Sequence, residues 1–265
     1  MKILFIGDIF AKVGRDLARR AIPALLRTHD LDLVLANGEN AAGGFGLTRE
    51  TANELFGLGI AAMTSGNHIW DKREVLAFID EEPRLLRPLN FPAGTPGRGS
   101  TIVTTTRGVR VGVVNLMGRV FMNPLDDPFS LGRAEVERLK AHAPVVFVDV
   151  HAEATSEKIA LGWHLDGLAT AVVGTHTHVQ TADNQVLPGG TAYLTDVGMT
   201  GPHDGVIGVD RGPVIHRFLT GLPSKFDTAT GMPRLHAVIV TADETGRATA
   251  IERLSLSPTD IEDLR

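Results

Sequence analysis

Two histidines, His176 and His178, alternate with threonines directly after an apolar run over residues 168–173. The run predicts a buried strand in a sheet that is covered on both faces. Alternate side chains of an extended backbone point to the same side, so we expect both imidazoles to face one point beyond the strand end. Neutral imidazole is the commonest protein ligand for metals, and open α/β sheets bind ligands at this end. The stretch therefore predicts a metal centre.

Four other predicted strands are each followed closely by polar residues of types that bind metals. They are Asp8 after residues 2–7, Glu39 and Asn40 after residues 32–36, Asn67 and His68 after residues 60–64, and His151 after residues 145–150. In a doubly wound sheet such strand ends lie side by side, so residues far apart in the sequence converge. Carboxylates, amides and imidazoles together are the ligands expected of a two-metal site. The chain has no cysteine, so nitrogen and oxygen would hold any metal.

These motifs resemble the calcineurin-like metallophosphoesterases over roughly the first two hundred residues. That superfamily carries an early Asp, a Gly-Asp pair, Gly-Asn-His, a lone His and Gly-His-x-His. This chain departs from the pattern at three places: Phe10 stands where the early motif has a histidine, Glu39 with Asn40 replaces the bridging Asp, and Gly-Thr-His-Thr-His replaces Gly-His-x-His. With Asn-Gly-Glu-Asn-Ala-Ala-Gly-Gly and Ser-Gly-Asn-His-Ile-Trp-Asp, these departures resemble the bacterial YmdB branch of cyclic-nucleotide phosphodiesterases.

The resemblance implies a role for each of these residues. One metal would be held by Asp8, Glu39, Asn40 and His178. The other would be held by Glu39, Asn67, His151 and His176, so that Glu39 bridges two ions. His68 would protonate the leaving-group oxygen as a general acid, and a water or hydroxide between the ions would be the nucleophile. The ligand types suit iron, manganese or zinc, and the resemblance favours iron.

The resemblance also implies a substrate, a small phosphoester. The expected reaction is hydrolysis of a 2′,3′-cyclic nucleotide to a 3′-nucleotide. Two alternatives stay open, namely a less selective phosphomonoesterase or nucleotidase, and a regulatory protein that binds metals and a nucleotide. Each alternative keeps the metal ligands, so His68 is the residue that discriminates between them.

Strand and helix patterns alternate along most of the chain. Helices are predicted over residues 15–28, 48–58 and 156–166. Another helix is predicted to begin at Asp71, where Asp71 and Glu74 have the spacing of a capping box, and one more is predicted to run from a cap at Ser130 to residue 141. Further strands are predicted over residues 101–106, 109–116, 185–187, 191–194, 235–242 and 248–256. This order predicts an α/β fold with helices outside and two sheets inside, and the resemblance implies a four-layer α/β/β/α sandwich of two mixed sheets. No linker or repeat divides the chain, so we expect one domain over residues 1–265.

Composition narrows the class of protein further. The 265 residues are 43% hydrophobic and 22% charged, as in ordinary globular proteins. A formal net charge of −5 argues against a broad nucleic-acid-binding surface but is compatible with a nucleotide in a metal-containing pocket. The absence of cysteine suits a reducing cytosol, the N-terminus is a poor signal peptide, and no apolar run reaches the length of a membrane span. We therefore expect a cytoplasmic protein.

The long apolar segment over residues 118–129 leaves three interpretations open. It suits a lid over the site, a contact between the subunits of a homo-oligomer, or a loop buried against the core. Phe45, Phe121 and Met122 are candidates for contact with a nucleobase.

Overall fold

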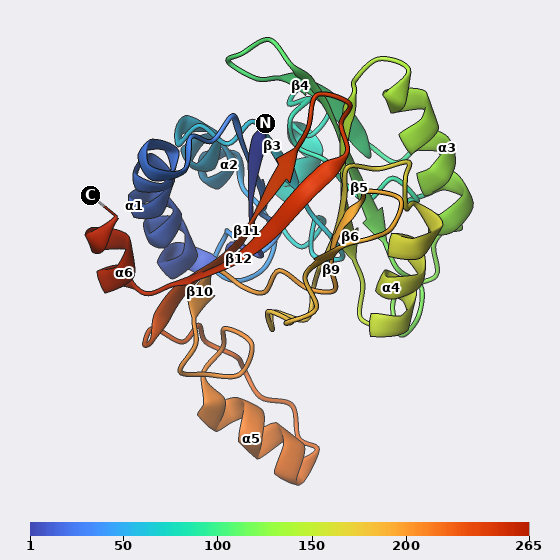
Figure 1. Ribbon diagram of the computed structural model, residues 1–265. Helices are drawn as coiled ribbons and strands as arrows, with labels where there is room; N and C mark the ends of the chain where they lie inside the picture. The colour runs from blue at the N-terminus through green and yellow to red at the C-terminus, as the bar shows by residue number, and fades with distance from the viewer. Residues whose placement is uncertain (265) are drawn as a thin grey trace.

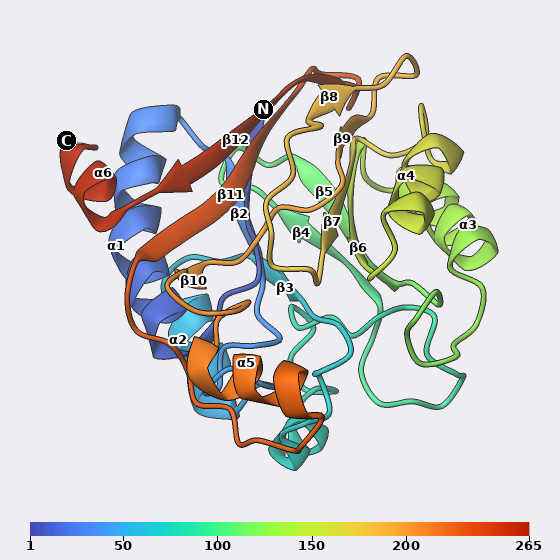
Figure 2. The same ribbon diagram turned by 90° about the horizontal axis from the view of Figure 1, so that it is seen from below.

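The computed structural model describes residues 1–264 and arranges them around two six-stranded mixed sheets (Figures 1 and 2). The first sheet has the order β10 (Gly201–Pro202), β11 (Pro233–Ala242), β1 (Lys2–Ile6), β2 (Leu33–Asn37) and β3 (Ala62–Thr64), with β12 (Ala248–Leu256) paired to β11. The second has the order β4 (Ser100–Thr104), β5 (Arg110–Met117), β6 (Val145–His151), β7 (Ala171–Thr175), β9 (Ala192–Leu194) and β8 (Gln185–Val186).

Helices cover the outer face of each sheet, while the two sheets pack against each other (Figure 1). α1 (Ala11–His29), α2 (Arg49–Gly57) and α6 (Pro258–Asp263) cover the first sheet, and α3 (Pro128–Lys140) and α4 (Thr155–His164) cover the second. Strand β1 shows why: Ile3 and Phe5 face the partner sheet, while Leu4 and Ile6 face the helices. A strand that is apolar on both faces is buried on both faces. The predicted four-layer α/β/β/α sandwich is therefore confirmed.

The candidate residues lie at the carboxyl ends of strands in both sheets. Strands β1, β2 and β3 run parallel in the first sheet, whereas β6 and β7 run parallel in the second. The sequence-based expectation placed all of these strand ends side by side in one doubly wound sheet, and this was wrong. The residues converge because the two sheets stack, with Phe5 and Phe147 in contact between them at a centroid distance of 5.1 Å.

Two predicted helix starts differ in the structure. Residues from Asp71 form only a short 3-10 turn, η1 (Arg73–Ala77), without a side-chain cap. The carboxylates of the expected capping box have other partners, since Asp71 pairs with His68 and Glu74 accepts from the Arg49 N–H. Helix α3 begins after Asp127, whose carboxylate caps it, rather than after Ser130.

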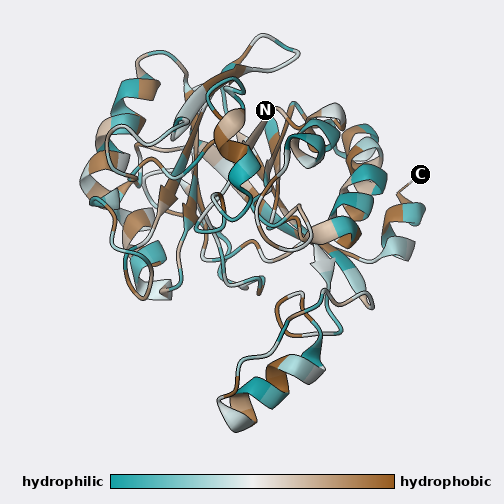
Figure 3. Ribbon diagram, turned by 180° about the vertical axis from the view of Figure 1, so that it is seen from behind, coloured by the Kyte–Doolittle hydropathy of each residue, from teal (hydrophilic) through white to brown (hydrophobic). Residues whose placement is uncertain are grey.

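A helix that the sequence did not predict, α5 (Arg211–Thr220), projects from the sandwich (Figures 1 and 3). Its residues Phe218 and Leu219 are 83% and 80% exposed. Polar and apolar residues mix along this helix in Figure 3. None of the helices in the described part of the chain combines the length and apolar character needed to span a membrane.

Candidate metal centre

The turn after β7 carries His176 and His178, but its backbone is not extended. His176 has a φ of +100° and His178 a φ of +66°, both in the left-handed region that residues other than glycine rarely adopt. The expectation that alternation along a strand aims the two imidazoles was therefore wrong in its geometry. Both histidines nevertheless line one cavity, because the left-handed turn directs them there.

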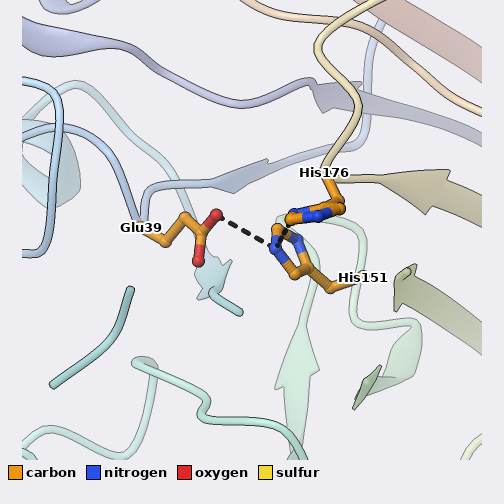
Figure 4. Close-up of side chains that lie close together, drawn as sticks. All are labelled: Glu39, His151 and His176. Carbon is orange, nitrogen blue, oxygen red and sulfur yellow. Dashed lines mark hydrogen bonds and ion pairs between the residues drawn. The ribbon is translucent and has the colours of Figure 1, made fainter. Parts of the chain in front are cut away.

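Four predicted ligands meet around one nitrogen atom. His151 Nε2 lies 2.9 Å from Asn67 Oδ1, 3.0 Å from Glu39 Oε1 and 3.0 Å from His176 Nδ1. Ligand atoms of Glu39, His151 and His176 all lie within 4.8 Å of one another (Figure 4). One ring nitrogen cannot satisfy three such partners with a single proton, whereas a cation among them would bind all four groups.

The remaining predicted ligands lie beside this group. Asn40 Nδ2 is 3.2 Å from His178 Nε2 and 3.3 Å from Glu39 Oε1, and Asp8 Oδ2 accepts from the His176 N–H at 3.1 Å. The other oxygens of the two side chains, Asp8 Oδ1 and Asn40 Oδ1, are buried without a hydrogen-bond partner. A buried oxygen without a donor is costly, and a bound cation would remove that cost. The residues therefore fit a metal.

Burial and mutual charge shift the pKa values of these groups strongly. Burial raises the pKa of Asp8 well above its usual range. Burial also disfavours the Glu39 carboxylate, but the neighbouring His151 and His68 together outweigh it and lower the pKa of Glu39 to about 2. Burial alone would lower the pKa of His151, but the neighbouring Glu39 carboxylate raises it to about 9. Burial, followed by His151, lowers the pKa of His176 to about 3. Such perturbed groups gathered in one cluster are typical of functional sites.

A second set of contacts orients the imidazole rings. His178 Nδ1 lies 2.9 Å from the Ile207 carbonyl, so it donates there and leaves Nε2 for the site. His176 Nε2 lies 3.1 Å from Glu153 Oε2, which leaves its Nδ1 beside His151. Partners of this kind fix the tautomer of a metal-binding histidine.

His151 is oriented by a buried relay that the sequence reasoning missed. Its Nδ1 is 2.9 Å from Thr175 Oγ1, and that hydroxyl donates to Asp149 Oδ1 at 2.8 Å. Asp149 also accepts from Thr64 Oγ1 at 2.5 Å and Asn37 Nδ2 at 3.3 Å, and burial raises its pKa to about 6. One signal was present in the sequence: Asp149 is a charged residue inside the apolar run 145–150, where it needs buried partners.

Gly66 explains how the His151 ring fits against the neighbouring strand end. A Cβ atom at position 66 would lie 2.1 Å from His151 Cδ2 and 2.2 Å from Nε2. No side chain is compatible with that approach, so the glycine of the Gly-Asn-His motif makes room for the imidazole.

His68 lies apart from the ligand group but lines the same cavity. Its Nδ1 is 2.8 Å from Asp71 Oδ2, which leaves Nε2 as its other ring nitrogen. Its backbone N–H donates to Glu39 Oε2 at 3.1 Å, and Phe45 packs against its ring at a centroid distance of 5.1 Å.

The cavity has a volume of about 550 Å³ and two chemically different walls. The polar wall contains four of the seven candidate ligands, namely Glu39, Asn40, His176 and His178, together with His68. The other wall is apolar and is built by Phe10, Phe45, Val206, Ile207, Val209, Val214, Phe218 and Phe226. Arg217 lines this side as well, with its guanidinium 5.5 Å from the centre of the Phe226 ring.

The segment 118–129 does not line this cavity. Arg119, Val120 and Phe129 line a separate hollow beside Glu157, and Phe121 is 91% exposed. Met122 packs against the core that α3 and α4 cover. Of the three candidates for contact with a base, only Phe45 lies at the candidate site.

Comparison with known proteins decides the family. Residues 4–254 match the family described as YmdB-like protein. The chain belongs to the YmdB-like family. The resemblance that the sequence motifs indicated is thereby confirmed.

The YmdB-like relatives match over nearly their whole length. The 2′,3′-cyclic-nucleotide 2′-phosphodiesterase of Bacillus subtilis (strain 168) is 51% identical over 258 residues, which cover 97% of each chain. A hypothetical protein from Thermus thermophilus has a crystal structure that matches with a TM-score of 0.91 and 46% identity, over 97% of this chain and 99% of that one. The structure titled as a novel phosphatase from Mycoplasma pneumoniae matches with a TM-score of 0.91 and 31% identity. The match covers 100% of this chain and 99% of that one.

Proposed function

We propose that this YmdB-like chain is a metal-dependent phosphodiesterase that hydrolyses 2′,3′-cyclic nucleotides to 3′-nucleotides. The observation that carries the proposal is the meeting of Glu39, Asn67 and His176 around Nε2 of the buried His151, beside a cavity of about 550 Å³ that Glu39 and His176 line. The 51% identity to the Bacillus subtilis phosphodiesterase supports the choice of substrate.

Seven residues would hold two ions. The first ion would take Asp8, Glu39, Asn40 and His178. The second would take Glu39, Asn67, His151 and His176, with Glu39 shared. Bound ions would supply Lewis-acid activation of water and neutralisation of the phosphate charge. Nitrogen and oxygen donors suit iron, manganese or zinc, and iron is our choice from the family resemblance.

His68 supplies the proton in the proposed reaction. A water oxygen adds to phosphorus and gives up one proton to the solvent, the bond from phosphorus to O2′ breaks, and O2′ takes a proton from His68 to become the free hydroxyl. His68 then regains a proton from the solvent. The phosphate stays on O3′, which gives the 3′-nucleotide. Asp71 holds Nδ1 of the ring, so Nε2 is the nitrogen that delivers the proton.

The apolar wall of the cavity suits the nucleobase. Phe45 and Phe226 offer aromatic surface within a cavity of about 550 Å³, a size typical of small-molecule sites. Arg217 adds hydrogen-bond donors on the same side. A site for inorganic phosphate alone would have no use for such a wall, which favours a nucleotide.

Substitution of His68 by alanine tests the proposal. The His68→Ala chain should keep its metal content and slow the turnover of 2′,3′-cyclic AMP by about 10²–10⁴-fold, because only the proton donor is lost. His142→Ala is the matched control, since His142 is exposed and lies in neither the ligand group nor the cavity lining. Unchanged turnover in His68→Ala would end its role as general acid. A metal-loaded chain that binds the nucleotide without cleaving it would instead be a regulatory protein.

A less selective phosphomonoesterase is the second candidate function. The match with the structure titled as a phosphatase from Mycoplasma pneumoniae favours it. Simple monoesters assayed beside cyclic diesters, with the same metal, decide between the two, because this candidate requires the monoesters to be the better substrates.

We place this activity in one domain over residues 1–265 and in the cytoplasm. Packing between the two sheets supports one domain, because residues from 3 to 248 contribute to that shared core. The lack of cysteine suits a reducing compartment.

A further inference from the structure

A buried ion pair lies directly behind the turn that carries His176 and His178. Lys158 of α4 and Asp196, which follows β9, have side chains that are 1% and 0% exposed, and Lys158 Nζ lies 2.7 Å from Asp196 Oδ2. Neither residue lines the candidate cavity. Burying two charges has a desolvation cost that an apolar pair would avoid, so their contacts indicate what the pair does.

Both charged groups hold the turn through its backbone. Lys158 Nζ donates to the Thr175 carbonyl at 2.9 Å. Asp196 Oδ2 accepts from the Thr177 N–H at 3.1 Å and from its hydroxyl at 2.8 Å, while Oδ1 accepts from the Gly198 N–H at 2.8 Å. The residues on either side of His176 are therefore fixed by one ion pair.

The turn needs such support because its backbone is strained. A φ of +100° at His176 and of +66° at His178 is unfavourable for residues with a Cβ atom. Strain of this kind persists only where surrounding contacts impose it. If the turn relaxed to ordinary dihedral angles, at least one imidazole would leave its present direction, and the contact of the His176 N–H with Asp8 would be lost.

We infer that the Lys158–Asp196 ion pair is a positioning device that holds residues 176–178 in the left-handed turn and so directs two imidazoles into the metal site. The inference rests on the proposed function only in taking His176 and His178 as ligands. Neither residue of the ion pair lines the cavity or belongs to the cluster of Glu39, His151 and His176.

The test uses the full chain without metal, titrated with Mn²⁺ by calorimetry. The variant Lys158→Met/Asp196→Ala removes both charges, so neither is left buried alone, and methionine is flexible enough to fill the space. We expect it to bind Mn²⁺ about 10–100-fold more weakly than the unmodified chain, the effect typical of losing groups that orient metal ligands. Asp183→Ala is the matched control: Asp183 accepts from Thr195, next to Asp196, and has no contact with the turn. It should bind Mn²⁺ as the unmodified chain does.

A second readout separates positioning from general loss of stability. Amide hydrogen exchange at His176, measured without metal, should accelerate in the double variant and not in Asp183→Ala when the two are compared at equal distance below their melting temperatures. Equal Mn²⁺ affinity and unchanged His176 exchange in the double variant would overturn the inference. If the double variant does not fold, Thr177→Val is used in its place, because it removes only the hydroxyl contact with Asp196. We expect this variant to bind Mn²⁺ several-fold more weakly than the unmodified chain. Unchanged Mn²⁺ binding would overturn the inference.

The two proposals fail in different ways. An unmodified chain that takes up no Mn²⁺ would contradict the proposed metal site, and His176 exchange would then decide the positioning role alone. An unmodified chain that binds Mn²⁺, with variants that bind it equally well, would contradict only the positioning role.

Discussion

Replacing Thr175 by valine removes one hydroxyl from the relay behind His151 and keeps the shape of the side chain. That hydroxyl donates to Asp149 Oδ1 at 2.8 Å and accepts from His151 Nδ1 at 2.9 Å. The position is fully buried, so water cannot replace either partner. Asp149 loses one of its donors, and the His151 ring loses the contact that fixes its tautomer.

The expected magnitudes follow from these two bonds. A buried hydrogen bond to a charged group contributes about 1.5–3 kcal/mol, and an unpaired buried donor costs about 1–3 kcal/mol, so we expect Thr175→Val to lose roughly 3 kcal/mol of stability. For a chain of this length that is a decrease of about 6–12 °C in melting temperature. Metal affinity should fall about 10–100-fold, because the ring no longer has a fixed orientation.

Thermal denaturation without metal and a Mn²⁺ titration measure the two effects separately. Thr170→Val is the matched control, because Thr170 is also fully buried, accepts from the Val146 N–H at 3.1 Å and donates to the Gly246 carbonyl at 2.7 Å, away from the site. The control should lose similar stability and keep its Mn²⁺ affinity. The relay has no role in orienting His151 if both variants bind Mn²⁺ equally well.

Two further predictions concern the cavity and the response to acid. Phe226→Ala should raise the KM for 2′,3′-cyclic AMP about tenfold, because roughly 1–3 kcal/mol of base stacking is lost. Hydrolysis of a small diester that has no base should be unchanged. Equal effects on both substrates would exclude a base site at the apolar wall. Burial, then His203, lowers the pKa of His236 to about 4, from an ordinary 6.5, so the folded state resists its protonation. Stability present above pH 6.5 is then lost as the pH falls toward 4, by about 3 kcal/mol in total. Urea unfolding at pH 7 and pH 4.5 should show that His236→Gln loses less unfolding free energy between the two pH values than the unmodified chain does. An identical loss in the two proteins would contradict the lowered pKa of His236.

The sandwich could be predicted because its strands are apolar on both faces. Runs such as residues 145–150 have few alternatives to a buried strand, and polar residues at their ends mark the site. Helix α5 was missed because Gly212 and Pro213 resemble a loop. In the structure Pro213 lies in the first turn, where its missing N–H is tolerated, and Asp210 caps the Gly212 N–H.

The contacts that orient the candidate ligands could not be predicted in the same way. A single lysine in a helix, such as Lys158, is normally expected to have a solvated side chain. In the structure this side chain is 1% exposed, because β7 and the segment after β9 enclose it. The left-handed dihedral angles at His176 and His178 have no local sequence signal either. They depend on which elements pack behind the turn, and this is a property of the tertiary structure.

The most direct test of the proposed metal-dependent phosphodiesterase is elemental analysis of the purified full chain, combined with a panel of phosphoesters assayed with the metal that is found. We predict close to two metal ions for each chain and preferred hydrolysis of 2′,3′-cyclic nucleotides to 3′-nucleotides. Less than one metal ion for each chain, with no gain in activity when metal is added, would contradict the account.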